Sequence, residues 1–86
     1  MPYALELRDH VDRLFEKLMR KGRKQLEAIT KKVAEICENP YKFKPLRAPM
    51  QNIRRVHIGS FVLTYSVNEM TKVIIIEDYA HHDDIY

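Results

Sequence analysis

The sequence predicts an α+β fold in which a strand and two helices precede a three-stranded antiparallel meander. Apolar residues recur at helical spacing between positions 9 and 38 and at strand spacing after position 53. The chain has 86 residues, enough for one hydrophobic core, so residues 1–86 are expected to form a single domain. The predicted element order is strand, helix, helix, strand, strand, strand.

The first strand and the first helix follow one another closely. Apolar residues at positions 3, 5 and 7 give the alternation of a half-buried strand. Asp9 is a suitable N-cap for the helix that follows, and Gly22 is a suitable end for it. The apolar stripe of this helix consists of Val11, Leu14, Phe15, Leu18 and Met19.

The second helix is expected from Arg23 to Glu38, because Asn39 precedes a proline and is disfavoured in the α conformation. Its apolar face consists of Leu26, Ile29, Val33, Ile36 and Cys37. The short link through Gly22 predicts an antiparallel helical hairpin that presents both stripes to one core.

The second half of the chain is predicted to be a meander. Residues 40–52 contain three of the four prolines and are expected to form an extended connection. Strands are predicted at 53–58, 61–67 and 72–79, and Gly59-Ser60 is a two-residue hairpin turn. Residues 73–76 are all aliphatic, so the last strand is expected in the interior of the sheet.

The two-residue turn fixes the register of the hairpin, with Ile58 opposite Phe61. The face that packs on the helices then contains Val56, Ile58, Phe61, Leu63, Tyr65 and Val67. The other face places Arg55 opposite Thr64 and His57 opposite Val62. This second face is expected to be wet and cationic.

Composition excludes several classes of protein. Cys37 is the only cysteine, so the chain can form neither an internal disulfide nor a cysteine-based zinc site. The aliphatic run 73–76 is far shorter than the roughly 18 residues of a membrane helix, and charged residues follow Met1 too early for a signal peptide. A cytoplasmic protein without a membrane association is expected.

Basic residues are concentrated in two stretches. Residues 17–32 hold seven Lys or Arg and one acid, and residues 42–57 hold five Lys or Arg and no acid. The rest of the chain holds three basic and eleven acidic residues. This asymmetry suits a polyanionic partner, although a solvated helix face explains the first stretch equally well.

The last six residues, His-His-Asp-Asp-Ile-Tyr, form a polar tail that contains candidate catalytic groups. Cleaving RNA through its own 2′-hydroxyl requires a base, an acid and fixed positive charge, and it needs no metal or other cofactor. The candidate catalytic residues are Arg55, His57, His81, His82 and Tyr86. The candidate RNA-binding residues are Lys42, Lys44, Arg47 and Arg54.

Simpler interpretations of these residues stay open. Arg55 and His57 are also what a solvated sheet face would show, and Tyr86 is also what a packed or frayed chain end would show. Adjacent residues on an extended chain point in opposite directions, so at most one of His81 and His82 is expected to face a cleft. A metal site formed by these histidines with Asp83 and Asp84 nearby is the other alternative, but no third ligand lies at usable spacing, so no metal site is predicted.

Four short motifs and their order along the chain resemble the RelE/ParE toxin superfamily. They are Asn39-Pro40, Lys44-Pro45-Leu46, the segment 55–61 (Arg-Val-His-Ile-Gly-Ser-Phe) and the end 80–86. The resemblance implies the toxin of a type II toxin–antitoxin module, neutralised by a cognate RelB-like antitoxin. RelE-type members cleave messenger RNA in the ribosomal decoding site, whereas ParE-type members inhibit DNA gyrase. By position, Arg55 and His57 match two basic strand sites, His82 lies near a basic tail site and Tyr86 matches a terminal tyrosine.

The sequence departs from the family pattern at three positions. Val62 stands where many ribonuclease members have arginine, Asp83 where the tail usually has a second basic residue, and His57 where Lys or Arg is more usual. Loss of one donor that stabilises a transition state costs roughly 3–4 kcal/mol in other enzymes. The departures therefore imply reduced activity or an altered target.

The leading interpretation is a metal-independent mRNA interferase, an endoribonuclease that inhibits translation with the ribosome and mRNA as partners. One alternative is a non-enzymatic inhibitor of DNA gyrase, which the valine at position 62 favours. The other is an RNA-binding or ribosome-binding module with weak or no catalysis. On either toxin interpretation, an antitoxin is expected to lie as an amphipathic segment on the helices or the sheet edge.

Overall fold

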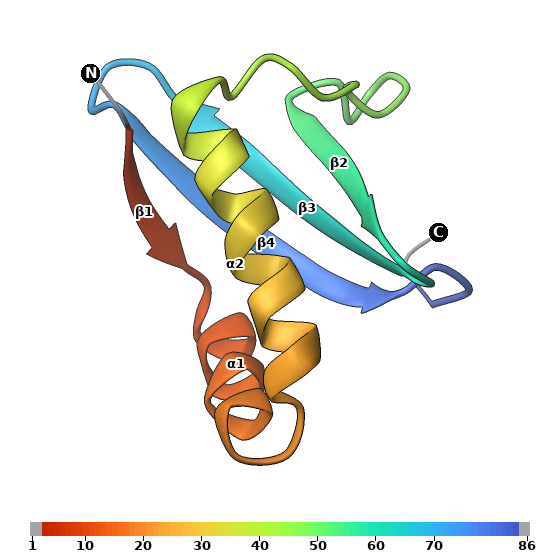
Figure 1. Cartoon of the computed structure of the whole chain (residues 1–86). Coiled ribbons are helices and arrows are strands. Elements are labelled where there is room, and N and C mark those ends of the chain that lie inside the picture. Colours follow the sequence, from red (N-terminus) through yellow and green to blue (C-terminus); the bar gives the residue numbers. More distant parts are fainter. Residues whose placement is uncertain (1–2, 85–86) are drawn as a thin grey trace.

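The elements follow the predicted order in the computed structural model, which describes residues 3–84 (Figure 1). The element bounds are β1 (Ala4–Leu7), α1 (Asp9–Lys21), α2 (Arg23–Glu38), β2 (Ile53–Ile58), β3 (Phe61–Asn68) and β4 (Val73–His81). The α+β fold class is thus confirmed, and β4 extends two residues beyond the predicted end of its strand.

The four strands form one sheet in the order β1-β4-β3-β2, so the prediction that the last strand lies in the interior is confirmed. The β2–β3 hairpin has the predicted register, and β3 pairs antiparallel with β4. β1 pairs parallel with β4, with Ala4 opposite Val73 and Leu7 opposite Ile76. A parallel pair needs a long crossover between its strands, and the intervening helices contribute to it.

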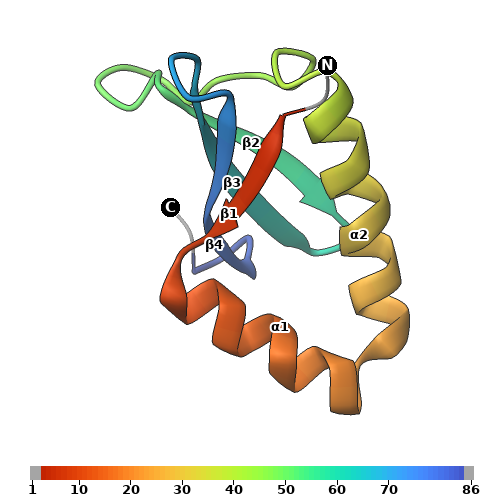
Figure 2. The ribbon, with the colours of Figure 1, turned by 90° about the vertical axis from the view of Figure 1, so that its left-hand side faces the viewer.

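Two details of α1 differ from the prediction. The helix begins at Asp9, and the N-cap position is Arg8, whose side chain makes no capping hydrogen bond. Asp9 and Asp12 instead lie in the first turn, where carboxylates interact favourably with the helix dipole. Met19 is 57% exposed, because the last turn of α1 projects past the sheet before the chain reaches α2 (Figure 2).

α2 runs along one face of the sheet (Figure 1) and buries Ile29 and Ile36 there. Leu26, Val33 and Cys37 are half-buried against the same core, which confirms the predicted face. The two helices are joined at Gly22, as the predicted hairpin requires. They diverge at a steep angle from this junction, so they do not lie side by side along their length (Figure 2).

Tyr65 joins the core to the connection between α2 and β2. Its side chain is fully buried in β3, and its hydroxyl donates a hydrogen bond of 2.7 Å to the buried carbonyl of Pro40. Burial raises the pKa of Tyr65 to about 12, so the hydroxyl keeps its proton. The start of the connection is therefore fixed to the sheet.

Candidate functional site

The sheet face opposite α2 carries the two basic residues expected on it. Arg55 pairs with Thr64 and His57 with Val62, as the turn predicted, and α2 lies on the other side of the sheet (Figure 2). The first turn of α1 reaches the face of Arg55, because His10 contacts Asp78, the β4 partner of Thr64. Residues two apart on a strand share a face and lie roughly 7 Å from each other. The His57 side chain is exposed, and Arg55 is half-buried.

The prediction that this face is wet is wrong for its middle strand. Val62 is fully buried and Thr64 is 5% exposed, although neither belongs to the face under the helices. β3 lies between β2 and β4, and Val62 and Thr64 pair with His57 and Arg55 of β2. The longer side chains of these neighbours cover the shorter ones of β3. Position 62 is thus a packed apolar site that supplies no charge.

The connection 39–52 runs beside β2 and brings basic residues to its edge. The Arg55 amide donates to the Lys44 carbonyl at 3.2 Å, and the Leu46 amide donates to the Ile53 carbonyl at 2.8 Å. Lys44 and Arg47 are exposed. These contacts place the Lys44 backbone next to Arg55 at the edge of the open face.

Two other candidate RNA-binding residues are engaged within the chain. Lys42 Nζ lies 3.2 Å from Glu35 Oε2 of α2, and this contact lowers the pKa of Glu35. Arg54 belongs to the helix-side face, where a guanidinium N–H donates to the Phe43 carbonyl at 2.7 Å. Its guanidinium also lies 5.0 Å from the ring centroid of Tyr41. Both side chains therefore anchor the connection.

The tail folds back onto the hairpin turn. β4 ends at His81, and a turn follows over 82–84, closed by a 2.8 Å hydrogen bond from the Asp84 amide to the His81 carbonyl. The His82 amide donates to the Ser60 carbonyl at 3.0 Å, and the His82 ring Nδ1 lies 3.2 Å from the same oxygen. The tail is thereby attached to the turn that follows Arg55 and His57. Tyr86, a predicted catalytic residue, lies outside the described residues.

The expectation that His81 and His82 point apart is wrong. Their ring centroids are 4.6 Å apart, because the chain leaves the extended conformation at His81. The Asp83 carboxylate lies 3.5 Å from His81 Nδ1 and 3.0 Å from His82 Nε2. His81 also contacts the ring of Phe61 edge-on, at 5.6 Å. The sequence rule for alternation fails here because it holds only within a strand.

The structure adds a polar cluster that sequence analysis missed. Arg8 makes two hydrogen bonds to the Glu77 carboxylate, at 2.8 and 3.2 Å, and Ser66 donates to Glu77 at 2.6 Å. Burial acts to raise the pKa of Glu77, but the hydrogen bonds from Arg8 and Ser66 lower it overall. His10 lies 3.3 Å from Asp78 nearby. The parallel pairing of β1 with β4 brings Arg8 to Glu77, and no local spacing indicates this pairing. Ser66 reaches Glu77 through the antiparallel β3–β4 pairing.

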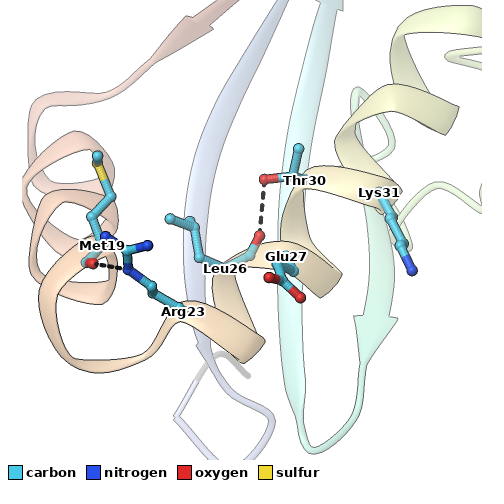
Figure 3. Close-up of a pocket in the computed structure, with 6 residues that line it drawn as sticks. All are labelled: Met19, Arg23, Leu26, Glu27, Thr30 and Lys31. Carbon is cyan, nitrogen blue, oxygen red and sulfur yellow. Dashed lines mark hydrogen bonds between the residues drawn. The ribbon is translucent and has the colours of Figure 1, made fainter.

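A separate groove lies on the helices. Figure 3 shows its lining at the junction of α1 and α2, and its volume is about 490 Å³. The lining residues are Met19, Arg23, Leu26, Glu27, Thr30 and Lys31. Leu26 and the exposed Met19 form an apolar floor with charged residues around it, which suits contact with another chain better than catalysis.

Sequence comparison identifies the family. Residues 3–86 match the family described as the ParE toxin of type II toxin-antitoxin system, parDE. A Methanosarcina mazei protein described as uncharacterized is 49% identical over 85 residues, covering 98% of this chain and 99% of that protein. A Methanocaldococcus jannaschii protein named "Putative toxin RelE4" is 44% identical over 98% of this chain and 90% of its own length. The chain belongs to the RelE/ParE toxin superfamily of type II toxin–antitoxin systems.

Solved structures share the fold. The free form of a mutant E. coli RelE toxin has a TM-score of 0.81 at 23% identity, over 99% of this chain and 88% of that one. The toxin–antitoxin complex RelBE2 of Mycobacterium tuberculosis gives 0.78 at 20% identity, over 95% of this chain and 100% of the matched chain. The archaeal RelE–RelB complex of Pyrococcus horikoshii gives a TM-score of 0.71 at 18% identity, over 98% of this chain and 99% of the matched chain. No helix within residues 3–84 is long and apolar enough to cross a bilayer.

Proposed function

We propose that this protein is the toxin of a type II toxin–antitoxin module and cleaves messenger RNA on the ribosome without a metal ion. Membership of the superfamily supports the toxin role. The main support for cleavage is the position of Arg55 and His57 on the sheet face opposite α2. The turn of the same hairpin holds His82.

The proposed reaction uses the substrate's own 2′-hydroxyl. A base removes its proton, the oxygen attacks the adjacent phosphorus, and the bond to the 5′-oxygen breaks as an acid protonates that oxygen. The products are a 2′,3′-cyclic phosphate and a 5′-hydroxyl. His57 and His82 are the proton-transfer candidates, a role that contributes roughly 10²–10⁴-fold in other enzymes. Arg55, with Lys44 and Arg47 at the strand edge, stabilises the negative charge that grows on the phosphate.

The departures from the family pattern set the expected strength of the activity. Val62 is buried and uncharged, and Asp83 places a carboxylate against the ring of His82. Each change removes positive charge from the phosphate site, and loss of one stabilising donor slows catalysis by roughly 10²–10³-fold elsewhere. The proposed nuclease is accordingly slower than a relative that keeps both basic residues.

An antitoxin partner and a cytoplasmic location belong to the same proposal. Structural neighbours from M. tuberculosis and P. horikoshii were solved as complexes with their antitoxins. The groove between α1 and α2 has an apolar floor, and its charged lining residues are two basic ones, Arg23 and Lys31, and one acidic one, Glu27. Charge complementarity favours an acidic amphipathic helix of the antitoxin as its occupant.

Inhibition of DNA gyrase is the second candidate function. The family match to ParE toxins and the apolar residue at position 62 both favour it. A supercoiling assay with purified gyrase separates the two proposals, because an enzyme that cuts only RNA does not inhibit the supercoiling of DNA by gyrase.

Expression in a bacterial host tests the toxin role. The chain is induced alone and together with the neighbouring reading frame, and the 5′ ends of cellular mRNA are mapped. Growth arrest with new mRNA ends, relieved by the neighbour, is the expected result. His57→Ala should relieve the arrest, whereas Met70→Ala, at an exposed position in the turn between β3 and β4, should not. Arrest without new mRNA ends would contradict cleavage, and harmless expression would contradict the toxin role.

A further inference from the structure

We propose that His81, His82 and Asp83 bind one divalent transition-metal ion of the zinc type, with water completing its coordination. Each residue offers one ligand atom, and the three atoms lie within 4.8 Å of one another. Neither the family nor the proposed cleavage assigns such a site, and binding can be measured on the chain alone.

The distances fit a metal ion. Ligand atoms at about 2.0–2.1 Å from a tetrahedral zinc ion lie roughly 3.3–3.4 Å from each other. Asp83 Oδ2 lies 3.5 Å from His81 Nδ1, and the other carboxylate oxygen, Oδ1, lies 3.0 Å from His82 Nε2, so each contact is close to this value. Rotation of the exposed His82 and Asp83 side chains toward the half-buried His81 would bring one atom of each residue onto one ion.

The hydrogen bonds orient lone pairs toward this point. The Ser60 carbonyl can only accept, so His82 Nδ1 must carry the proton that joins them at 3.2 Å. In the neutral ring, His82 Nε2 then presents a lone pair to the Asp83 carboxylate. Metal-binding histidines commonly donate their other ring N–H to a backbone carbonyl in this way.

His81 shows the complementary arrangement. The Asp83 amide donates to His81 Nδ1 at 3.3 Å, so this nitrogen also acts as an acceptor. This nitrogen has one lone pair, so an ion bound there would displace the amide hydrogen bond, and water can take the place of the ring nitrogen at the Asp83 amide in the exposed turn.

The chemistry of the ligands favours particular ions. Imidazole with one carboxylate suits Zn²⁺, Ni²⁺ and Cu²⁺ better than Mg²⁺ or Ca²⁺, which prefer oxygen ligands. A bound ion would hold the turn 82–84 closed and keep it attached to the Ser60 turn.

Isothermal titration of the full chain, without an affinity tag, with zinc chloride near neutral pH tests the proposal. One ion per chain is expected, together with shifts of the Ser60 and Asp83 amide signals in NMR spectra. His82→Ala and Asp83→Asn should each weaken binding by about tenfold or more. Both side chains are exposed, and circular dichroism verifies that the variants fold.

His10→Ala is the matched control, because His10 also lies against a carboxylate, that of Asp78, at 3.3 Å. It should bind zinc as the unchanged protein does. Absence of saturable binding, or binding that His82→Ala leaves unaltered, would overturn the proposal. Either result leaves the proposed mRNA cleavage untouched, because cleavage is measured without added metal. An ion on His82 Nε2 would block proton transfer by that ring.

Discussion

Replacing Tyr65 by phenylalanine tests how the connection between α2 and β2 is held. The substitution keeps the buried ring and removes only the hydroxyl that donates to the Pro40 carbonyl at 2.7 Å. Pro40 is buried as well, so its carbonyl would lose a partner that water cannot easily replace. A buried acceptor left unsatisfied costs about 1–3 kcal/mol.

The free energy of unfolding, measured by urea titration with circular dichroism, should fall by that amount. For a domain of this size, each kcal/mol lowers the melting temperature by roughly 4–8 °C. Thr30→Val is the control, because it also removes one hydroxyl donor, and the Thr30 hydroxyl donates at 2.9 Å to the Leu26 carbonyl on the exposed surface of α2. Surface substitutions usually change stability by less than about 0.5 kcal/mol. Equal losses in the two variants would refute the role assigned to the Tyr65 hydroxyl.

Three further predictions concern stability and reactivity. Hydrogen bonds from Tyr3 and Tyr41 lower the pKa of Glu69 to about 2 from its ordinary 4.5. The ionised Glu69 therefore stabilises the folded state fully above pH 4.5, and this contribution is lost as the pH falls toward 2. Acid titrations of stability should therefore be shallower for Glu69→Gln, and an unchanged profile would contradict the contact. Gly59 has a φ of +61° and open space where a Cβ would lie. Gly59→Ala should therefore lower the free energy of unfolding by about 1 kcal/mol through backbone strain alone. An unchanged free energy of unfolding in a urea titration would be inconsistent with that turn. Burial raises the pKa of the Cys37 thiol, so it should react with a thiol reagent more slowly than free cysteine at the same pH; equal rates would argue against its burial.

The fold was predictable because its signals are local. Helical spacing, as of Ile29 and Ile36, and a two-residue turn, as at Gly59, depend only on nearby positions. The predicted burial of Ile29 and Ile36 and the predicted register of the hairpin both agree with the structure. The parallel pairing of β1 was not predictable in this way, because it joins segments about 70 residues apart. The contact of Arg8 with Glu77 depends on that pairing and was missed with it.

The candidate site was predictable in part. The register placed Arg55 and His57 on one face, but alternation gives no information on how neighbouring side chains cover Val62. Alternation also failed at His81 and His82, where the chain turns. The roles of these residues and of Tyr86 in catalysis stay predictions.

The central claim, cleavage of ribosome-bound mRNA by the open sheet face, is tested most directly by primer extension. Purified protein is added to a defined mRNA with and without programmed ribosomes, in a buffer whose magnesium level is kept constant. We expect cuts at decoding-site positions that require the ribosome, and a loss of roughly 10²-fold or more in rate for Arg55→Ala and His57→Ala. Arg13→Ala on the exposed surface of α1 and Met70→Ala in the exposed turn between β3 and β4 should cut normally. Intact mRNA with the folded, unchanged protein, or equal cutting by all four variants, would contradict the account.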